Sequence, residues 1–446
     1  MALTGIQIYK LLPQTNCKEC GQATCLAFAM KLAAKQAELS LCPYVSEEAK
    51  ATLAESAAPP IRLITLAANG YEVKAGNEVV LFRHEKTFYH KPGLFVRVRD
   101  SQPKDAIQAT VKAADAYSVV YVGIDLSISG FAVESDSGDP AKFSAAVSAV
   151  REVSQRPLIL IAADPKVMEA GLRAIDGERP LIAHATADNW SAMAALAKGA
   201  GAPLAVAAPT LDGLAELTEQ VKGAGVEDMV LVPQARDLSA LLALSTQIRR
   251  LAIKKNFRPL GYPVMTFPGD AGDVGRESIF AAQSIAKYAG FIVLDTFAPE
   301  MIYPLLVLRE NIYTDPQKPI QVTPGLYPIN NPTPESPVLT TTNFSITYFS
   351  VANEVEGSGL PAWLLVTDAE GMSVLTAWAA GKFDAERIAK SVKEFNVADK
   401  VTNKRIVLPG AVAVLSGELE EELQGWEVKV GPREAVDIPA FMKLAL

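Results

Sequence analysis

The central part of the chain, from about residue 93 to residue 312, alternates short apolar runs with amphipathic stretches. The runs are nearly continuous in apolar residues, which is typical of parallel strands that are covered on both faces. Eight such strands, each followed by a helix, form a TIM (β/α)8 barrel. We therefore predict a closed TIM barrel over residues 93–312, with an open doubly wound sheet as the alternative. The expected strands are Phe95–Val98, Val119–Ile124, Leu158–Ala163, Leu181–Ala185, Leu204–Ala208, Met229–Val232, Val264–Phe267 and Phe291–Leu294; the expected helices include Ala141–Val153, Lys166–Ile175, Trp190–Lys198, Leu211–Lys222 and Leu238–Lys254.

The C-terminal residues, 340–446, restart the alternation of strand and helix. We predict a small Rossmann-like domain, which binds ligands outside the carboxyl ends of its strands. Glycine and serine at those ends let a backbone approach a ligand closely, although ordinary loops also use them. The expected strands are Phe344–Phe349, Trp363–Val366, Arg405–Leu408 and Trp426–Val430, and the expected helices are Val374–Ala380, Ala385–Glu394 and a stretch from Gly410 to Leu423.

Three further segments complete the predicted organisation. Residues 1–57, the cysteine module, contain expected helices at Gly5–Leu12 and Leu26–Leu39. Residues 58–92 are read as connecting strands, with short runs at 62–68, 71–73 and 79–84. Residues 313–339 hold seven prolines, so we expect a semi-rigid linker with little regular structure.

Composition and charge narrow the functional classes. The chain of 446 residues is 49% hydrophobic and 21% charged, an ordinary composition for a globular protein with several domains. Its net charge is −8 and no basic block occurs, so nucleic-acid binding is not expected. The sequence starts without the pattern of a signal peptide and contains no long apolar run, so we expect a cytoplasmic protein that does not cross a membrane.

All four cysteines lie within 26 residues, in the spacing C-x2-C-x4-C-x16-C-P. Disulfides are disfavoured because nothing indicates secretion. Zinc modules generally present two paired ligand motifs, and no histidine lies near these thiols. Four thiolates and a terminal Cys-Pro favour an iron–sulfur cluster, with zinc and free redox thiols as the open alternatives. The candidate ligands are Cys17, Cys20, Cys25 and Cys42.

The expected barrel carries polar residues at its strand ends, where TIM barrels place their chemistry. Asp125, Asp188 and Asn189 could bind a polar substrate, but no nucleophile elbow, metal-binding helix motif or phosphate loop occurs. Acidic residues at such junctions are often helix N-caps. We therefore favour a docking platform over a barrel with its own active site.

Three stretches together resemble the large subunit of the corrinoid iron–sulfur protein of the reductive acetyl-CoA pathway, over the full length. They are N-C-K-E-C-G-Q-A-T-C-L-A-F-A-M with the later L-C-P-Y, T-T-N-F-S-I-T-Y-F, and L-L-V-T-D-A-E-G-M-S-V-L-T-A-W. The resemblance implies a methyl carrier that receives a methyl group from methyltetrahydrofolate through a separate methyltransferase and delivers it to acetyl-CoA synthase/CO dehydrogenase. It also implies a heterodimer with a small subunit and a reductive activator as a further partner.

The same resemblance assigns residues to two cofactors. The four cysteines would bind a [4Fe-4S] cluster that returns Co(II) to Co(I), and the C-terminal domain would bind the corrinoid. No histidine follows His184, so that domain has no imidazole for the cobalt and a base-off cobalamin is expected. The implied corrinoid contacts are Thr340, Thr347, Glu370, Gly371, Met372, Ser373, Val374, Gly431 and Arg433.

Two other functions stay open at this point. The chain could be an iron–sulfur electron-transfer or scaffold subunit whose C-terminal domain binds a nucleotide. Alternatively, the barrel itself could be a pterin-dependent methyltransferase. Tight nucleotide binding without a corrinoid would support the first, and methyl transfer by this chain alone to free cobalamin would support the second.

Overall fold

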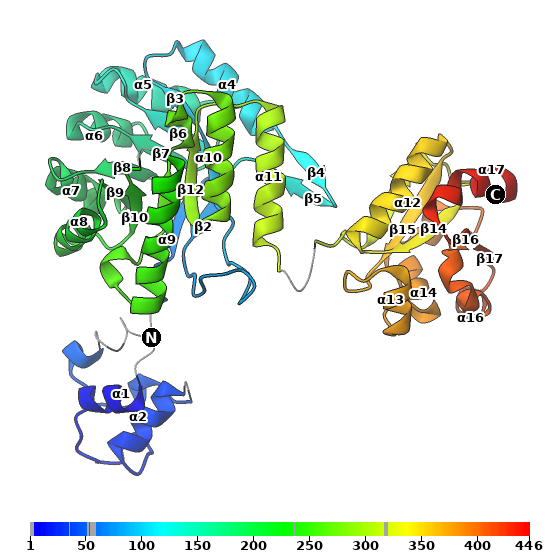
Figure 1. The fold of residues 1–446 in the computed structure, drawn as a ribbon, viewed down its shortest axis with the longest axis horizontal. Helices are drawn as coiled ribbons and strands as arrows, with labels where there is room; N and C mark the ends of the chain where they lie inside the picture. The colour runs from blue at the N-terminus through cyan, green and yellow to red at the C-terminus, as the bar shows by residue number, and fades with distance from the viewer. Residues whose placement is uncertain are drawn as a thin grey trace. The chain divides into compact units, whose positions relative to one another are not determined.

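The computed structural model describes residues 4–34, 36–50, 53, 59–175, 177–235, 237–315 and 320–446. The chain divides into two compact units. The barrel unit comprises residues 1–117 and 127–313, and the tail unit comprises residues 118–126 and 314–446. Figure 1 shows the elements of both units. No helix among the described residues is both long and apolar enough to span a membrane.

The barrel unit contains a closed barrel of eight parallel strands, in the spatial order β10-β11-β12-β3-β6-β7-β8-β9. This confirms the predicted TIM-barrel class. Seven of the eight strands coincide with the predicted runs. The bounds are β3 Gly93–Arg99, β6 Gly130–Glu134, β7 Leu158–Ile161, β8 Leu181–Ala185, β9 Leu204–Ala208, β10 Met229–Pro233, β11 Val264–Thr266 and β12 Ala289–Leu294.

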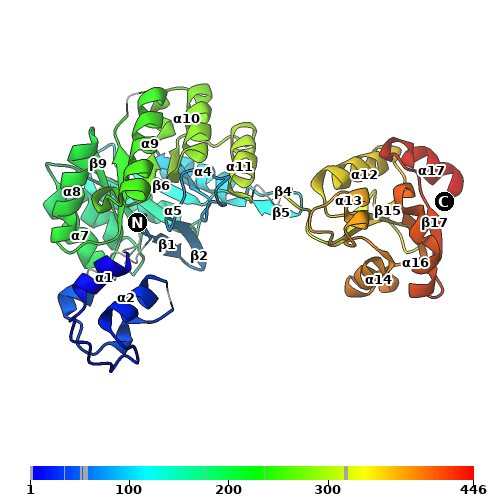
Figure 2. The ribbon, with the colours of Figure 1, turned by 60° about the horizontal axis from the view of Figure 1, so that its bottom comes forward.

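Helices surround this barrel, as Figures 1 and 2 show. Several of them begin with an N-cap residue whose side-chain oxygen accepts a hydrogen bond from the first turn, including Asp139, Asp164, Thr210 and Asp273. These polar residues therefore start helices. The bounds are α4 Lys104–Ala116, α5 Pro140–Arg151, α6 Pro165–Arg173, α7 Trp190–Ala200, α8 Leu211–Gly223, α9 Leu238–Lys255, α10 Val274–Ala286, α11 Pro299–Tyr313, and the 3-10 turns η2 Arg258–Leu260 and η3 Pro268–Ala271.

The predicted barrel strand Val119–Ile124 is wrong. This run folds into an antiparallel hairpin, β4 Val119–Tyr121 and β5 Ile124–Leu126, which belongs to the tail unit. Its two-residue turn, Val122-Gly123, has positive φ at both positions, the conformation that suits a tight hairpin. The barrel strand is instead β6, which pairs with β3 and β7.

A second hairpin, β1 Ile64–Ala68 and β2 Tyr71–Ala75, extends the barrel core. Its inward side chains, Ile64, Leu66 and Val73, pack with the apolar side chains that fill the barrel. The predicted run at 79–84 is not a strand. Its backbone turns instead, with Glu85 accepting hydrogen bonds from the amides of Leu81 and Phe82.

The cysteine module contains helix α1 Gly5–Leu11, helix α2 Cys25–Ala33 and the 3-10 turn η1 Leu39–Leu41. Helix α2 ends earlier than the predicted residue 39. Thr4 caps α1 with a capping box, and Thr24 caps α2. A small apolar cluster that includes Phe28, Cys25 and Cys42 holds the module together.

The tail unit is built on a five-stranded sheet in the order β13-β15-β14-β16-β17. Strand β13 is antiparallel to β15, and the other pairs are parallel. Helices cover both faces. The bounds are β13 Gly325–Ile329, β14 Val338–Thr342, β15 Ala362–Thr367, β16 Arg405–Leu408, β17 Glu427–Val430, α12 Ser345–Ser358, α13 Val374–Ala379, α14 Ala385–Glu394, α15 Val397–Lys400, η4 Gly410–Leu415, α16 Ser416–Glu422, η5 Ala435–Asp437 and α17 Ile438–Ala445.

Two predictions about this unit are wrong. The stretch Phe344–Phe349 is not the first strand, because Phe344 is the N-cap of helix α12. Its apolar alternation resembled a strand, but the strand is the threonine-rich β14 just before it. The proline-rich stretch 313–339 is not a simple linker either. Residues 325–329 form β13, and Ile320 and Val322 are buried in the tail core.

Candidate functional site

The tail unit contains a pocket of about 350 Å³ at the carboxyl ends of β14, β16 and β17. Helix α12 contributes part of its wall, and helix α17 contributes another part. Six of the nine predicted contact residues line this pocket, and three do not. Those that line it are Thr340, Thr347, Ser373, Val374, Gly431 and Arg433.

The other three predicted contacts, Glu370, Gly371 and Met372, form the turn that leads to the pocket wall. Glu370 and Gly371 both have positive φ. Glu370 forms an ion pair with Lys382 at 2.6 Å, and Met372 packs against the core on one face of the sheet. These three residues therefore lie outside the pocket lining, directly before the lining residues Ser373 and Val374 in the chain.

The pocket lining also contains residues that the sequence analysis did not name as contacts. Pro409 and Ala411 follow strand β16, whose carboxyl end had been expected to face a ligand. Ile346 and Leu375 are apolar yet 66% and 56% exposed. Ile346 was not predicted as a contact because the stretch Phe344–Phe349 had been assigned to a strand. It lines the pocket from helix α12.

Two backbone segments approach each other very closely at this pocket. A Cβ atom on Gly410 would lie 2.4 Å from the carbonyl oxygen of Gly431 and 2.8 Å from the carbonyl carbon of Pro432. The amide of Gly410 also donates a hydrogen bond to the Pro432 carbonyl at 2.9 Å. Glycine is therefore required at position 410 to bring the ends of β16 and β17 together.

Seven of the 21 residues that line the pocket have polar or charged side chains. The Thr340 hydroxyl donates to the carbonyl of Val407 at 2.8 Å. The hydroxyl of Thr341 is fully buried and has no hydrogen-bond partner among the described residues. Arg433 is exposed and forms no hydrogen bond or ion pair with the part of the chain that the structure describes. Thr341 and Arg433 can therefore still bond to a bound molecule.

A mostly apolar pocket with a few unused polar groups suits a large organic cofactor that is partly covered by other surfaces. No histidine follows His184 in the sequence, so an imidazole ligand from the tail unit is excluded. The residues present thus fit a corrinoid whose metal lacks a histidine donor. An unpartnered hydroxyl, a close glycine contact and exposed apolar walls are the observations behind this fit.

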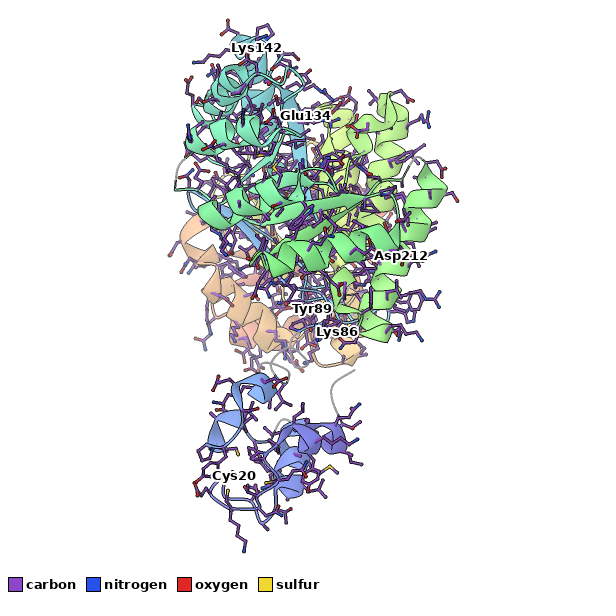
Figure 3. The ribbon with its side chains drawn as sticks, turned by 90° about the vertical axis from the view of Figure 1, so that its left-hand side faces the viewer. Cys20, Lys86, Tyr89, Glu134, Lys142 and Asp212 are labelled. Carbon is purple, nitrogen blue, oxygen red and sulfur yellow. The ribbon has the colours of Figure 1, made fainter. Side chains whose placement is uncertain are left out.

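The four cysteines lie in the loop before α2, at its first residue and after η1. Figure 3 labels Cys20, which lies in that loop. Cys17 is exposed, Cys20 is half-buried, and Cys25 and Cys42 are buried. The side chain of Asn16 accepts from the Cys25 amide at 2.8 Å, and the amide of Asn16 donates to the Cys25 sulfur at 3.4 Å. Hydrogen bonds to ligating sulfurs are one of the factors that set the reduction potential of an iron–sulfur cluster.

A side-chain hydrogen bond joins the segment after η1 to the loop before α2 in the cysteine module. The Tyr44 hydroxyl donates to Glu19 at 2.8 Å. This bond and the charge of Glu19 raise the pKa of Tyr44, with smaller contributions from Cys17 and Cys42. Among the described residues, no three side chains of the metal-binding types converge on one point. The donor set of four thiols in one small module nevertheless fits an iron–sulfur cluster better than a hard metal ion.

The mouth of the barrel holds a network of charged residues. Arg97 is 2% exposed in its side chain and contacts Asp295, Asp270 at 2.6 Å and Glu134 at 3.3 Å. Burial opposes the charge of Arg97, but these ion pairs outweigh it and raise the Arg97 pKa. Burial also disfavours charge on Asp295, yet Arg97 and Arg99 lower its pKa. These groups satisfy one another, which is typical of a structural network.

Two of the three polar residues predicted for the barrel, Asp125 and Asn189, have other places or roles in the structure. Asp125 lies in hairpin β4–β5 of the tail unit, outside the barrel. The Asn189 amide bonds to the carbonyl of Ala163 at 2.9 Å and accepts from the Thr186 amide at 2.7 Å. Asn189 therefore shapes the turn before α7.

The chain matches known proteins over nearly all of its length. A family profile described as CO dehydrogenase/acetyl-CoA synthase delta subunit matches residues 63–442, and one described as a putative Fe-S cluster matches residues 12–44. The corrinoid/iron-sulfur protein large subunit of Moorella thermoacetica is 46% identical over 446 residues, which is all of both chains.

Archaeal relatives match as well. The acetyl-CoA decarbonylase/synthase complex subunit gamma of Methanopyrus kandleri is 36% identical, over 99% of this chain and 97% of that one. The corresponding subunit of Archaeoglobus fulgidus is 35% identical, over 98% and 97%. These matches confirm the resemblance that the sequence motifs indicated. The chain therefore belongs to the family of corrinoid/iron-sulfur protein large subunits, and it is also similar to gamma subunits of the acetyl-CoA decarbonylase/synthase complex.

Proposed function

We propose that this chain is a methyl-carrier subunit whose tail unit binds a base-off corrinoid in the pocket at the carboxyl ends of β14, β16 and β17. The observation that carries the proposal is this pocket, which gathers six predicted contact residues in a unit without histidine. When bound, the corrinoid supplies a cobalt that accepts a methyl group from methyltetrahydrofolate through a methyltransferase and gives it up to acetyl-CoA synthase.

The residues of the pocket have distinct roles in this proposal. Gly410 lets the ends of β16 and β17 approach each other, Gly431 lets the backbone approach the cofactor, and Ile346 and Leu375 contact its apolar surface. Thr341 and Arg433 supply polar contacts to its amide or phosphate groups. Since no imidazole can donate electron density to the metal from this unit, the reduced state that accepts the methyl group is easier to reach.

The cysteine module is proposed to hold a [4Fe-4S] cluster on Cys17, Cys20, Cys25 and Cys42. Its thiols come from two loops and the first residue of α2, and two of them are buried in the module core. Such a cluster supplies single electrons for returning inactive cobalt to its reduced form. The exposed position of Cys17 allows electrons to enter from a reductive activator.

The barrel unit is proposed to serve as a docking platform. Its charged mouth is internally paired, and its polar turn residues are used by the fold. The partners we propose are the small subunit, with which the chain forms a heterodimer, the methyltetrahydrofolate methyltransferase, acetyl-CoA synthase/CO dehydrogenase and a reductive activator. The place of action is proposed to be the cytoplasm, where the ligating thiols stay reduced.

The test is anaerobic incubation of the purified chain with hydroxocobalamin, followed by removal of the unbound compound. We expect about one cobalt per chain by metal analysis and, after one-electron reduction with a chemical reductant, a Co(II) electron paramagnetic resonance spectrum without splitting from a nitrogen ligand. Arg433→Gln should weaken binding, whereas Lys443→Gln, with the same charge change on α17 outside the pocket, should not. No retained cobalt, or a nitrogen-ligated spectrum, would contradict the proposal.

A further inference from the structure

One buried side chain connects three segments of the tail unit without lining the pocket. Asn343 follows β14 and is 1% exposed. Its side-chain oxygen accepts from the amides of Ala369 at 2.9 Å and Gly371 at 3.0 Å. Its side-chain nitrogen donates to Asp368 at 3.1 Å and to Gln321 at 3.2 Å. All four hydrogen-bonding positions of the Asn343 amide are therefore used.

The orientation of this amide follows from its partners. Two backbone N–H groups meet one end of the amide, so that end must be the oxygen. The other end faces the oxygens of Asp368 and Gln321, which accept hydrogen bonds from the nitrogen. No other side chain of this size can accept two bonds and donate two in this geometry.

The turn that Asn343 holds has an unusual backbone. Glu370 and Gly371 both adopt positive φ, which is costly for Glu370. The side chain of Gln321 also packs against Gly371, where a Cβ atom would lie 2.7 Å from it. Because hydrogen bonds from Asn343 reach both sides of Glu370, this side chain keeps the turn in its unfavourable conformation.

The turn leads directly into the pocket wall. Ser373, Val374 and Leu375 follow it, and all three line the pocket. The wall therefore starts two residues after the last amide that Asn343 holds. A shift of the turn must move these three residues with it.

We propose that Asn343 is a positioning residue for cofactor binding: by holding the 368–371 turn, it sets where the Ser373–Leu375 wall meets the bound group. This inference rests on the proposed function of the pocket. It assigns a role to the asparagine of the T-T-N-F stretch, which does not touch the pocket itself. A purely structural asparagine would affect stability and leave affinity unchanged.

The main test changes the polarity of this network. Asn343→Asp keeps the shape and the acceptor for Ala369 and Gly371, but it loses both donors and puts a second carboxylate beside Asp368. Asp368→Asn added to it restores one carboxylate and one amide with donor and acceptor exchanged, and Gln321 can rotate its amide to donate. The exchange leaves the Glu370 amide without the Asp368 oxygen that accepts its hydrogen bond at 3.0 Å. We expect Asn343→Asp to weaken hydroxocobalamin binding about tenfold or more, and the double variant to recover part of that loss.

A matched control separates positioning from stability. Asn330 lies in the same unit, and its amide donates to the carbonyls of Val355, Glu356 and Leu360. Asn330→Asp should lower the unfolding midpoint of the cofactor-free chain without changing the dissociation rate of hydroxocobalamin. Gly371→Ala disturbs the same turn from the side of Gln321 and should weaken binding, which keeps the test available if Asn343→Asp does not fold.

Binding is measured on the full chain by absorbance, and hydrogen exchange on the cofactor-free chain follows the amides of Ala369 and Gly371. Faster exchange there, together with weaker binding and recovery in the double variant, supports the proposal. Unchanged affinity in both Asn343→Asp and Gly371→Ala overturns it, as does an equal loss of affinity in Asn330→Asp. Failure of the unchanged chain to take up hydroxocobalamin would instead contradict the proposed function.

Discussion

The close approach of β16 and β17 at the pocket makes Gly410→Ala an informative change. The new methyl group would lie 2.4 Å from the Gly431 carbonyl oxygen, whereas ordinary contacts begin at 3.4 Å. The neighbours of this methyl group are backbone atoms of Gly431, Pro432 and Arg433, which cannot rotate away. The loop must therefore recede by about 1 Å, and overpacking of this kind typically costs about 1–3 kcal/mol.

We expect two measurable consequences. The tail unit should lose about 1–3 kcal/mol of stability in denaturant unfolding. Hydroxocobalamin affinity should fall as Arg433 moves away, about tenfold for each 1.4 kcal/mol of work needed to draw the loop back. Tryptophan fluorescence reports mainly on this unit, because Trp363, Trp378 and Trp426 lie in it and only Trp190 lies in the barrel unit.

Gly417→Ala is the matched control. Gly417 lies in α16, and a Cβ atom there would meet nothing within 4 Å. Alanine is the better helix former, so this variant should gain about 0.5–1 kcal/mol and bind the corrinoid normally. The reasoning would be refuted if Gly410→Ala were as stable as the unchanged chain and bound hydroxocobalamin equally well.

Three further predictions concern other parts of the chain. Cys20→Ala should leave methyl transfer from already reduced cobalt intact and abolish reactivation by an electron donor. Equal loss of both activities in a coupled assay would contradict the separate roles of the corrinoid and the cluster. Gly123→Val should cost the tail unit about 1–3 kcal/mol more than Gly138→Val costs the barrel unit, because both glycines have positive φ but only Gly123 packs against other atoms, with the Tyr327 hydroxyl 3.2 Å from the added Cβ. Calorimetric unfolding of the two variants measures the difference. Burial lowers the pKa of His184, so the barrel unit should be fully stable above about pH 6.5 and lose stability as the pH falls toward the folded-state pKa. Thermal unfolding across this pH range should show a smaller loss of stability in His184→Gln. An identical pH dependence in the variant and the unchanged chain would count against this explanation.

Local patterns along the chain were enough to predict the fold class. Seven barrel strands, including β7 and β12, are nearly continuous apolar runs, because a parallel strand covered on both faces has no polar side. The cysteine spacing identified the module in the same way. The candidate pocket was also largely accessible, because parallel strands such as β14 and β17 end at one edge of a sheet wherever they lie in the sequence.

Tertiary structure alone decided the rest. The apolar run at 119–124 has the same composition as the barrel strands. Only its packing against the tail core places it in the tail unit. The stretch Phe344–Phe349 alternates like a strand but forms a helix, because β14 already fills the central position of the sheet. Asn343 bonds with Gln321 and Ala369, which lie 22 and 26 residues away, and no local pattern encodes such contacts. Periodicity reports which side chains need burial; which segments meet, and which polar groups they leave unpaired, depends on the packing of the whole unit.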